Sequence, residues 1–337
     1  MRRLRAIVLC HEDLVPPASL AGLSRRARDA VRTEWDVARA LRGAGHAVRV
    51  VGVSHDLEPL RRAAAQLRPD AVFNLLMEFR DEGRFQAHVI AFLELLGIPV
   101  TGPDARGILL SRDKALAKTV WLRQGLPTPA FAVFPRRGPA EGLAGLRYPL
   151  IIKSRDEEAS LGIAQASLVR DAARLRARVA FIHRRLGTDA IAEEYVAGRE
   201  LTVSVIGNER LLALPIRELA FSRLPAGSAP IATTRAKFDD AYRRRAGIRS
   251  GPARALAPRA RAEIRGLATR AYRGLGLSGY ARLDLRLPAE GPPQVIEANA
   301  TPDVAAAEDF AASARAAGIP YPRLLDRIVR LALARRP

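Results

Sequence analysis

The segment Gly279–Asp303 constrains the fold of this chain most, because apolar and charged residues alternate along two short runs within it. A period of two is typical of β-strands that have one face in the core and the other outside it. The turn sequence Pro-Ala-Glu-Gly-Pro-Pro between the runs predicts that the two strands fold back on each other. The resulting hairpin carries four polar side chains on one surface: Arg282, Asp284, Glu297 and Asn299.

This set of side chains has a chemical interpretation and a purely structural one. Two carboxylates and an amide oxygen suit a hard cation such as Mg²⁺, and an arginine beside them suits a phosphate or an oxyanion. An ordinary exposed hairpin face shows the same alternation, because any half-buried strand does. The hairpin alone leaves both interpretations open.

The charge of the chain raises the question of nucleic-acid binding. The 337 residues are enough for two or three domains and carry a formal net charge of +20. However, the arginines are spread along the whole sequence, and aromatic residues make up only 5% of it. Neither zinc-finger spacing nor an aromatic RNA-binding motif is present. We therefore do not expect nucleic-acid binding to be the primary function.

Lysine is scarce, which makes the few lysines informative. Of the 55 basic residues only four are lysine: Lys114, Lys118, Lys153 and Lys237. Where positive charge is enough, this chain uses arginine, so a retained lysine indicates a position that needs a compact ammonium group. Chance retention is the alternative, because four residues are a small sample.

Two absences set expectations about the compartment. Cys10 is the only cysteine, so no intramolecular disulfide can form. The apolar run Ala6–Cys10 is too short for a signal peptide, and no run of about 18 apolar residues could span a membrane. We expect a cytoplasmic protein with no membrane association.

The chain divides into three predicted units. Residues 1–105 alternate short apolar runs with segments of helical period, and this βαβ rhythm predicts an N-terminal α/β domain with a parallel sheet. The glycine-rich turn of a dinucleotide site is missing after its first strand. Residues 106–192 and 193–337 form two further units. Within the last unit, the long irregular stretch 221–252 is typical of a lid or binding loop, or of a disordered segment.

Seven phrases in a fixed order resemble the ATP-grasp superfamily and, within it, the D-alanine–D-alanine ligases. Six of them are Arg-Asp-Lys at 112–114, Gly-Leu-Pro at 125–127, Pro-Leu-Ile-Ile-Lys at 149–153, Ala-Ser-Leu-Gly-Ile at 159–163, Glu-Glu-Tyr-Val-Ala-Gly-Arg-Glu at 193–200 and Ala-Lys-Phe-Asp-Asp at 236–240. The seventh is the hairpin itself. The resemblance covers nearly the whole chain. It implies an α/β fold, α+β in the nucleotide-binding half, in which a central and a C-terminal subdomain clamp ATP between two sheets.

The resemblance also implies roles for residues of these phrases. Lys114 and Lys153 would contact the phosphates of ATP, and Lys237 would reach the γ-phosphate as the loop 221–252 closes. Around the nucleoside and the phosphates, the implied contacts are Glu193 with the backbone of Glu194, Tyr195 and Val196 for adenine, Glu200 for the ribose, and Ser160 beside the phosphates. Asp284, Glu297 and Asn299 would hold two Mg²⁺ ions.

The reaction implied by the resemblance joins a carboxylate to an amine. The γ-phosphate passes to the carboxylate, and the amine then attacks the acyl phosphate, so the partners are small molecules. Arg282 would stabilise the tetrahedral oxyanion, a contact that can contribute about 3 kcal/mol. No general base is evident, and an amine that enters neutral needs none. The family resemblance also suggests a homodimer.

Several positions depart from the family pattern at the substrate end of the site. The glycine-rich strand-turn that carries a serine and a glutamate is replaced by Leu9-Cys10-His11-Glu12, and the family's histidine-glycine region by Met77–Gly83. Four single positions also differ: Ala159 for a serine, Phe238 for a tyrosine, Asp303 for a glycine and Glu308 for a serine. Asp303 and Glu308 would repel a carboxylate and favour a cationic group, or else cap the following helix. Glu157 and Glu158 in the phosphate loop point outward or meet a substrate amine.

We therefore expect an ADP-forming carboxylate–amine ligase whose substrate is not D-alanine. One alternative is a genuine D-alanine–D-alanine, or D-alanine–hydroxy acid, ligase with a rearranged pocket. The other is a non-catalytic module that binds ATP or nucleic acid.

Overall fold

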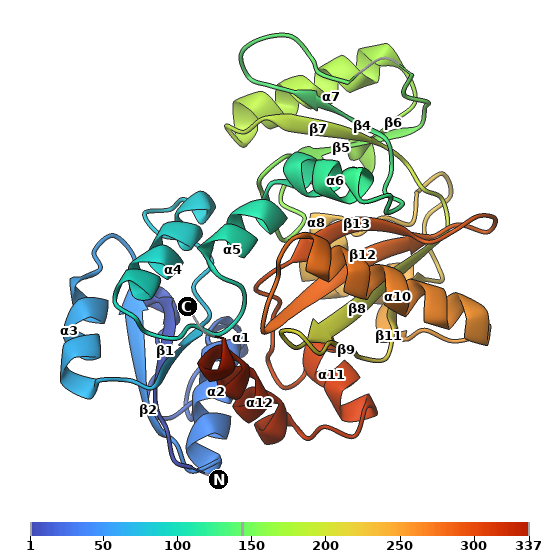
Figure 1. Cartoon of the computed structure of the whole chain (residues 1–337). Helices are drawn as coiled ribbons and strands as arrows, with labels where there is room; N and C mark the ends of the chain where they lie inside the picture. Colours follow the sequence, from blue (N-terminus) through green and yellow to red (C-terminus); the bar gives the residue numbers. More distant parts are fainter. Residues whose placement is uncertain (1, 143–144, 336–337) are drawn as a thin grey trace.

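A computed structural model of the chain describes residues 2–142 and 145–335. Three β-sheets organise these residues, with helices packed on them (Figure 1). The N-terminal sheet lies beside the C-terminal one, and the central sheet stands above both in this view. None of the helices formed by residues 2–142 and 145–335 is long and apolar enough to cross a membrane.

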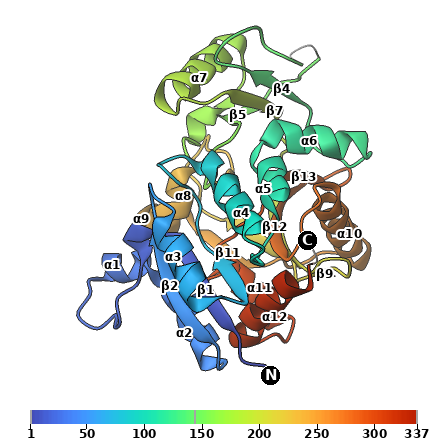
Figure 2. The same ribbon diagram turned by 60° about the vertical axis from the view of Figure 1, so that its left-hand side comes forward.

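The N-terminal sheet is parallel, as the βαβ rhythm predicts. Its strands run in the order β2-β1-β3, and Ala6 of β1 lies opposite both Val48 and Ala71. The strands are β1 (Arg5–His11), β2 (Ala47–Val53) and β3 (Ala71–Asn74), and the helices of this part are α1 (Arg25–Ala30), α2 (Arg32–Gly43), α3 (Glu58–Leu67) and α4 (Gln86–Leu95). Figure 2 shows α4 and then α5 (Ala105–Arg112), which lead from this part toward the central one.

The last helix of the chain also belongs to this N-terminal core. On one face of the sheet, Val8 and Phe73 pack with Leu324 and Ile328 of α12 (Tyr321–Ala334), while α3 and α4 cover the other face. The prediction had assigned 193–337 to one unit. The apolar stripe of α12 instead completes the burial of a sheet whose strands lie about 250 to 320 residues before it in the sequence.

The central sheet is antiparallel, in the order β4-β7-β5-β6. Its strands are β4 (Phe131–Phe134), β5 (Leu150–Ser154), β6 (Leu168–Val169) and β7 (Ala190–Glu194). The helices of this part are α6 (Lys114–Arg123) and α7 (Ala172–Arg185), and α7 packs its buried side chains on the sheet. β7 runs past the predicted boundary at 192, because its last residues still pair with β4 and β5.

The C-terminal sheet is antiparallel and runs β11-β10-β8-β12-β13, with β9 paired to β8. Its strands are β8 (Arg199–Ile206), β9 (Leu212–Ala213), β10 (Arg217–Phe221), β11 (Ile248–Pro252), β12 (Tyr280–Leu287) and β13 (Gln294–Asn299). The helix α10 (Pro258–Gly274) covers one face, where it buries Ile264 and Leu267 against the leucines of β12. The helix α11 (Asp309–Ala316) follows the hairpin.

The stretch 221–252 is not irregular throughout, so this part of the prediction is wrong. It contains α8 (Thr234–Phe238), α9 (Asp240–Ala246) and the edge strand β11. The side chains of Thr233 and Asp239 cap the two helices, accepting from backbone amides over 3.1 and 2.8 Å, and Gly247 ends α9 in the left-handed region at φ 61°. These capping signals are present in the sequence.

Candidate active site

The C-terminal sheet has one apolar and one polar face. Leu283 and Leu285 of β12 are fully buried on the α10 side, so the residues between and beside them lie on the opposite face. Antiparallel pairing gathers the polar side chains of three strands there: Glu200 of β8, Arg282, Asp284 and Arg286 of β12, and Glu297 and Asn299 of β13. The structure thus brings the four hairpin residues together on one surface.

Arg282 and Asp284, predicted to act separately, are bonded to each other. Nε and Nη2 of Arg282 donate to the two oxygens of Asp284 over 2.6 and 2.8 Å, and both side chains are mostly buried. Burial would lower the pKa of Arg282, but the negative charge of Asp284 raises it. A carboxylate has about four lone-pair sites, so a cation at Asp284 would share this residue with Arg282.

Two of the lysines meet at Glu193 in the central sheet. The Nζ atoms of Lys153 and Lys118 lie 3.0 and 3.4 Å from Oε2 of Glu193, and all three side chains are buried. Lys118 also donates to Oγ1 of Thr128 over 2.9 Å. The other oxygen of Glu193, Oε1, is buried and has no hydrogen-bond partner among the residues that the structure describes. It remains an acceptor for a donor such as the amino group of adenine.

The charges of three lysines also act on Glu297, across from the central sheet. Burial would raise the pKa of Glu297, but Lys114, Lys153 and Lys237, together with Arg282, lower it to about 2. Glu297 acts in turn on Lys118. All four lysines of the chain therefore surround the two carboxylates of Glu193 and Glu297, as expected if lysine is retained where a compact charge is needed.

Lys118 is a site residue to which the sequence analysis gave no role. Burial lowers its pKa to about 8, although the neighbouring Glu193 opposes this shift. Lys118 lies four residues after Lys114 on α6, a spacing that puts both side chains on one face of a helix. That spacing is the signal from which its place could have been predicted.

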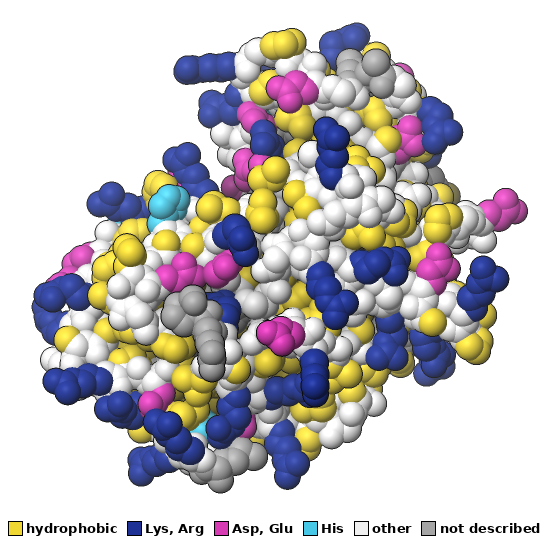
Figure 3. Space-filling view, in the orientation of Figure 1, with side chains coloured by type: hydrophobic (Ala, Val, Ile, Leu, Met, Phe, Trp, Pro, Cys, Tyr) yellow, Lys and Arg dark blue, Asp and Glu magenta, His cyan; other side chains and the backbone are white. Residues whose placement is uncertain are grey.

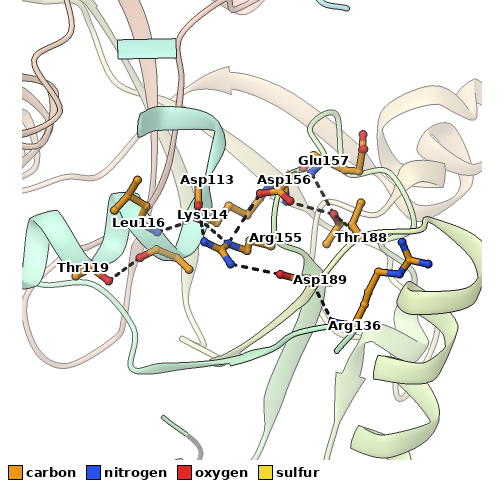
Figure 4. Close-up of polar contacts among 12 residues, drawn as sticks. Asp113, Lys114, Leu116, Thr119, Arg136, Arg155, Asp156, Glu157, Thr188 and Asp189 are labelled. Atoms are coloured by element: carbon orange, nitrogen blue, oxygen red, sulfur yellow. Dashed lines mark hydrogen bonds and ion pairs between the residues drawn. The ribbon is translucent and has the colours of Figure 1, made fainter. Parts of the chain in front are cut away.

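A charged network holds the end of α6 where Lys114 stands (Figure 4). Asp113 caps this helix by accepting from a first-turn amide over 2.9 Å, and its two oxygens accept from Arg155 over 3.0 and 2.6 Å. Arg155 also reaches Asp189 at 3.4 Å. Lys114 donates through Nζ to the carbonyl of Glu157 in the loop after β5. Within the Arg-Asp-Lys phrase, Asp113 therefore caps the helix and forms an ion pair, and Lys114 is hydrogen-bonded to the predicted phosphate loop.

The predicted phosphate loop and the predicted lid are joined to each other. Ala159 and Ser160 have left-handed backbones at φ 53° and 58°, a conformation that costs free energy in residues with a Cβ atom. The carbonyl of Ser160 accepts from Oγ1 of Thr234 over 2.7 Å, and the amide of Thr234 donates to Ile163 over 3.0 Å. Thr234 begins α8, the helix that carries Lys237. Lys237 and Ser160 are thus held on neighbouring segments.

The acids of the phosphate loop take different directions. Glu158 forms a largely buried pair with Arg112, with 3.4 Å between Oε2 and Nη1. The carboxylate of Glu157 points away from the network around Arg155 (Figure 4). Glu158 is therefore neutralised from within the chain.

The residues predicted to hold the nucleoside are positioned by β7 and β8. The carboxylate of Glu194 accepts from Arg147 on the side away from Glu193. The amides of Glu194 and Tyr195 donate over 2.9 Å to the carbonyls of the residues just before β4 and β5, so a backbone contact to adenine would fall to their own carbonyls and to Val196. Glu200 accepts from Arg286 over 2.6 Å. Burial raises the pKa of Glu200, and Arg286 opposes that shift.

The donor set of the hairpin fits a hard cation. Among residues 2–142 and 145–335 there is no cluster of three or more His, Cys, Asp or Glu residues arranged for a metal. The predicted set has two carboxylates, Asp284 and Glu297, and the amide of Asn299, all with oxygen atoms. Two surface hollows that lie along β2 contain none of the predicted site residues. The candidate site is therefore located from the side chains that converge on it and not from a surface hollow.

Two antiparallel sheets that face each other across lysines and carboxylates define the ATP-grasp class of fold. The structure is similar to the crystal structure of the D-alanine–D-alanine ligase from Bacillus anthracis complexed with ATP, with a TM-score of 0.75, 21% identity and 98% of each chain covered. This similarity confirms the predicted fold.

Sequence comparisons then identify the family. The family model described as the D-ala D-ala ligase C-terminus matches residues 120–330. The D-alanine–D-alanine ligase of Bordetella petrii is 32% identical over 86% of this chain and 85% of its own length. An uncharacterized protein of Sinorhizobium fredii, y4sG, is 34% identical over 82% of this chain and 76% of its own. The chain belongs to the D-alanine–D-alanine ligase family and is an ATP-dependent ligase of that type.

Proposed function

We propose that this ligase joins a carboxylate other than D-alanine to an amine, through an acyl phosphate formed from ATP. The observation that carries the proposal is the convergence of all four lysines on the carboxylates of Glu193 and Glu297, beside the polar face of the hairpin. Phosphoryl transfer needs mainly alignment and compensation of charge, and this arrangement provides both.

We assign different roles in binding ATP and Mg²⁺ to different residues of the site. Lys114, Lys153 and Lys237 attract the phosphates, and Glu193 accepts from adenine through its free oxygen. Asp284, Glu297 and Asn299 would hold Mg²⁺, which screens the charge of the phosphates when bound. Lys118 keeps Glu193 in place. These roles are supported by position and charge.

Arg282 is suited to the second half of the reaction. The amine nitrogen attacks the acyl carbon, the C–O bond to phosphate breaks with its electron pair, and the nitrogen loses a proton. A guanidinium has five N–H groups, and two of those of Arg282 donate to Asp284. The remaining three are held in a fixed direction and can donate to the oxyanion of the tetrahedral intermediate.

The substrate end of the site argues against D-alanine. The serine and the tyrosine of the family pattern are Ala159 and Phe238 here, and the side chain of Phe238 is 69% exposed. A genuine D-alanine–D-alanine ligase is the second candidate, favoured by the name of the Bordetella petrii relative. We keep the homodimer and the cytoplasmic location as predictions.

Hydroxylamine provides the test, because it traps acyl phosphates without the natural amine. The purified protein with ATP, Mg²⁺, hydroxylamine and pools of carboxylates should give hydroxamate and ADP in equal amounts with one pool. D-alanine alone should release no phosphate, and phosphate release with it would establish the second candidate. Tight ATP binding with no hydroxamate from any pool would indicate a binding module instead.

A further inference from the structure

A group of acids lies beyond the hairpin, where the segment after Asn299 crosses the first turn of α2. Oγ1 of Thr33 donates to Oδ1 of Asp303 over 2.9 Å. The amide of Ala306 donates to Asp36 over 3.0 Å. Since Glu34 stands between Thr33 and Asp36 on α2, this crossing brings Glu34 and Asp303 to one place, although about 270 residues separate them.

Glu34 is buried without a partner for its charge. The residue is only 4% exposed, and its carboxylate meets no side-chain donor among the residues that the structure describes. Burial raises the pKa of Glu34 to about 7, and the neighbouring charge of Asp303 adds to this shift. The backbone amide of Glu34 opposes the shift by hydrogen bonding, so the carboxylate has a donor but no cation, although a buried carboxylate is normally paired with one.

Glu308 extends the group toward Arg282. It occupies the N-cap position of α11, yet its side chain makes no capping hydrogen bond. The capping role that the sequence left open is therefore not its role. Glu308 lies at the surface, and partial desolvation of its carboxylate raises its pKa, with further contributions from Asp303 and Asp309, while Arg243 and Arg282 oppose the shift from nearby.

Three of the arginines near these acids are engaged with other carboxylates, and Arg243 donates to the backbone carbonyl of Lys237 over 3.5 Å. Arg282 is bonded to Asp284, Arg217 pairs with Asp309 at 2.8 Å, and Arg32 pairs with Asp29 at 2.6 Å. Within residues 2–142 and 145–335, neither Glu34 nor Asp303 nor Glu308 forms an ion pair with a basic side chain. Glu308 is close enough to Arg282 for the two charges to act on each other, so this unpaired negative charge lies at the end of the site where the amine must reach the carbon beside Arg282.

We propose that Glu34, Asp303 and Glu308 bind a second, cationic group of the amine substrate, so that this substrate is a diamine or a basic amino acid. The inference rests on the proposed function for the place of the amine. It can nevertheless be tested without the reaction, because the site should bind a molecule with an added ammonium group more tightly than the same molecule without it.

Matched amines test this preference by binding alone. Lysine and norleucine differ at the end of the side chain, where lysine has an ammonium group, and ornithine and norvaline form a second such pair. Titration calorimetry of the protein with ADP and Mg²⁺, with both enantiomers of each amino acid, should show one basic amino acid bound at least about tenfold more tightly than its neutral counterpart. Equal affinity within every pair would overturn the proposal.

Substitutions test whether Glu34 and Glu308 cause the preference for a basic amino acid. Glu34→Gln keeps the shape of the side chain, and Glu308→Gln alters an exposed residue, so the second variant serves if the first does not fold. Each should reduce the preference about threefold or more. Glu263→Gln on the exposed side of α10 should leave it as in the wild type. An unchanged preference in both Glu34→Gln and Glu308→Gln would overturn the assignment.

The two proposals fail in different ways. Absence of hydroxamate with every carboxylate would contradict the ligase reaction, while a preference for lysine or ornithine in the calorimeter would still support the cation site. Conversely, hydroxamate formation with equal binding of lysine and norleucine would support the ligase and reject the cation site.

Discussion

The site has a cationic end, where the four lysines lie near Glu193 and Glu297, and an acidic end formed by Glu34, Asp303 and Glu308. The two ends differ in whether their charged side chains are paired. Around the predicted nucleotide, buried charges have partners: Lys153 and Lys118 with Glu193, Arg282 with Asp284, and Arg155 with Asp113. Around the predicted amine, Glu34, Asp303 and Glu308 lie together, and Glu34 is buried without a cation from the described residues.

This difference suggests which end accounts for family membership and which for specificity. A paired cluster keeps its shape whether or not its ligand is bound, which suits a ligand as constant as ATP. An unpaired carboxylate favours whatever ligand supplies the opposite charge, which is how a site selects among amines. The surface around both ends gives little further guidance, because arginines and lysines are spread over the face seen in Figure 3.

The largest effect is expected where the lysines meet the carboxylates. Lys153→Ala removes a predicted phosphate contact and leaves Glu193 with Lys118 as its remaining cation, and Glu297→Ala removes the acid on which the charges of three lysines act. Either change should abolish ADP formation, about a thousandfold or more, because transition-state charge is then uncompensated. Arg123→Ala removes a positive charge from the exposed end of α6 and should be near wild type. ADP formation at the wild-type rate in either variant would contradict the assignment of the site.

A smaller loss is expected at Arg282. Arg282→Ala should lower the rate of amide formation about 100-fold, since removal of one oxyanion donor costs about 3 kcal/mol. Because Asp284 loses its partner as well, the dependence on Mg²⁺ concentration should also change. Arg282→Lys keeps the charge but not the two parallel bonds, so it should recover only part of the rate. Full recovery by lysine would mean that the geometry of the guanidinium is unimportant.

The cationic end could be predicted from the sequence because it is made of local patterns. The period of two along 279–303 places Arg282, Asp284, Glu297 and Asn299 on one face, and pairing in the hairpin then brings them together. The scarcity of lysine in the sequence indicated the other residues at this end, Lys114, Lys153 and Lys237. The pattern could not show that Arg282 bonds to Asp284, because it specifies a face and not the partner of each side chain.

The acidic end depends on contacts that no local pattern reveals. Glu34 lies in the first turn of an amphipathic helix, where an acid is ordinarily exposed. It is buried because the segment 303–306 crosses that turn, and this crossing depends on α11 and α12 packing onto the N-terminal sheet. In the stretch 221–252, by contrast, the capping residues Thr233 and Asp239 are local signals, from which α8 and α9 could have been predicted.

The titration of Glu34 offers a test of the acidic end without any substrate. Its pKa is about 7 in the folded protein against an ordinary value near 4.5, so the folded state binds the extra proton between these values. The free energy of unfolding should therefore fall as the pH rises from about 4.5 to about 7, by at most about 3 kcal/mol from this group. Glu34→Gln should remove that fall, and denaturant unfolding at pH 5, 6, 7 and 8 measures it.

The comparison between variants isolates Glu34 from other titrating groups. Glu263→Gln should follow the wild-type curve, since this exposed side chain has the same charge in a different place. If Glu34→Gln and the wild type lose the same stability between pH 5 and pH 8, then Glu34 is ionised with a partner, and the acidic end is no longer uncompensated.

The smallest effect is expected at the cap of α6, on the cationic end. Asp113→Ala removes both the helix cap and the partner of Arg155, and Asp113→Asn keeps an oxygen for the cap while losing the charge. A cap contributes about 1 kcal/mol, and a partly buried ion pair such as Arg155–Asp113 contributes about 1 kcal/mol at most. The alanine variant should thus lose about 1 to 2 kcal/mol of stability and the asparagine variant about half of that, measured by urea unfolding.

The effect of these two variants on ATP separates a positioning role from a structural one. Because Lys114 directly follows Asp113 and is tied to the carbonyl of Glu157, displacement of the helix end should raise the KM for ATP several-fold and change kcat less. Asp171→Ala removes the corresponding cap of α7, which carries none of the predicted site residues, and should lower stability without raising that KM. An equal rise in KM in Asp171→Ala would mean that general loosening of the central part, rather than the position of Lys114, accounts for the loss.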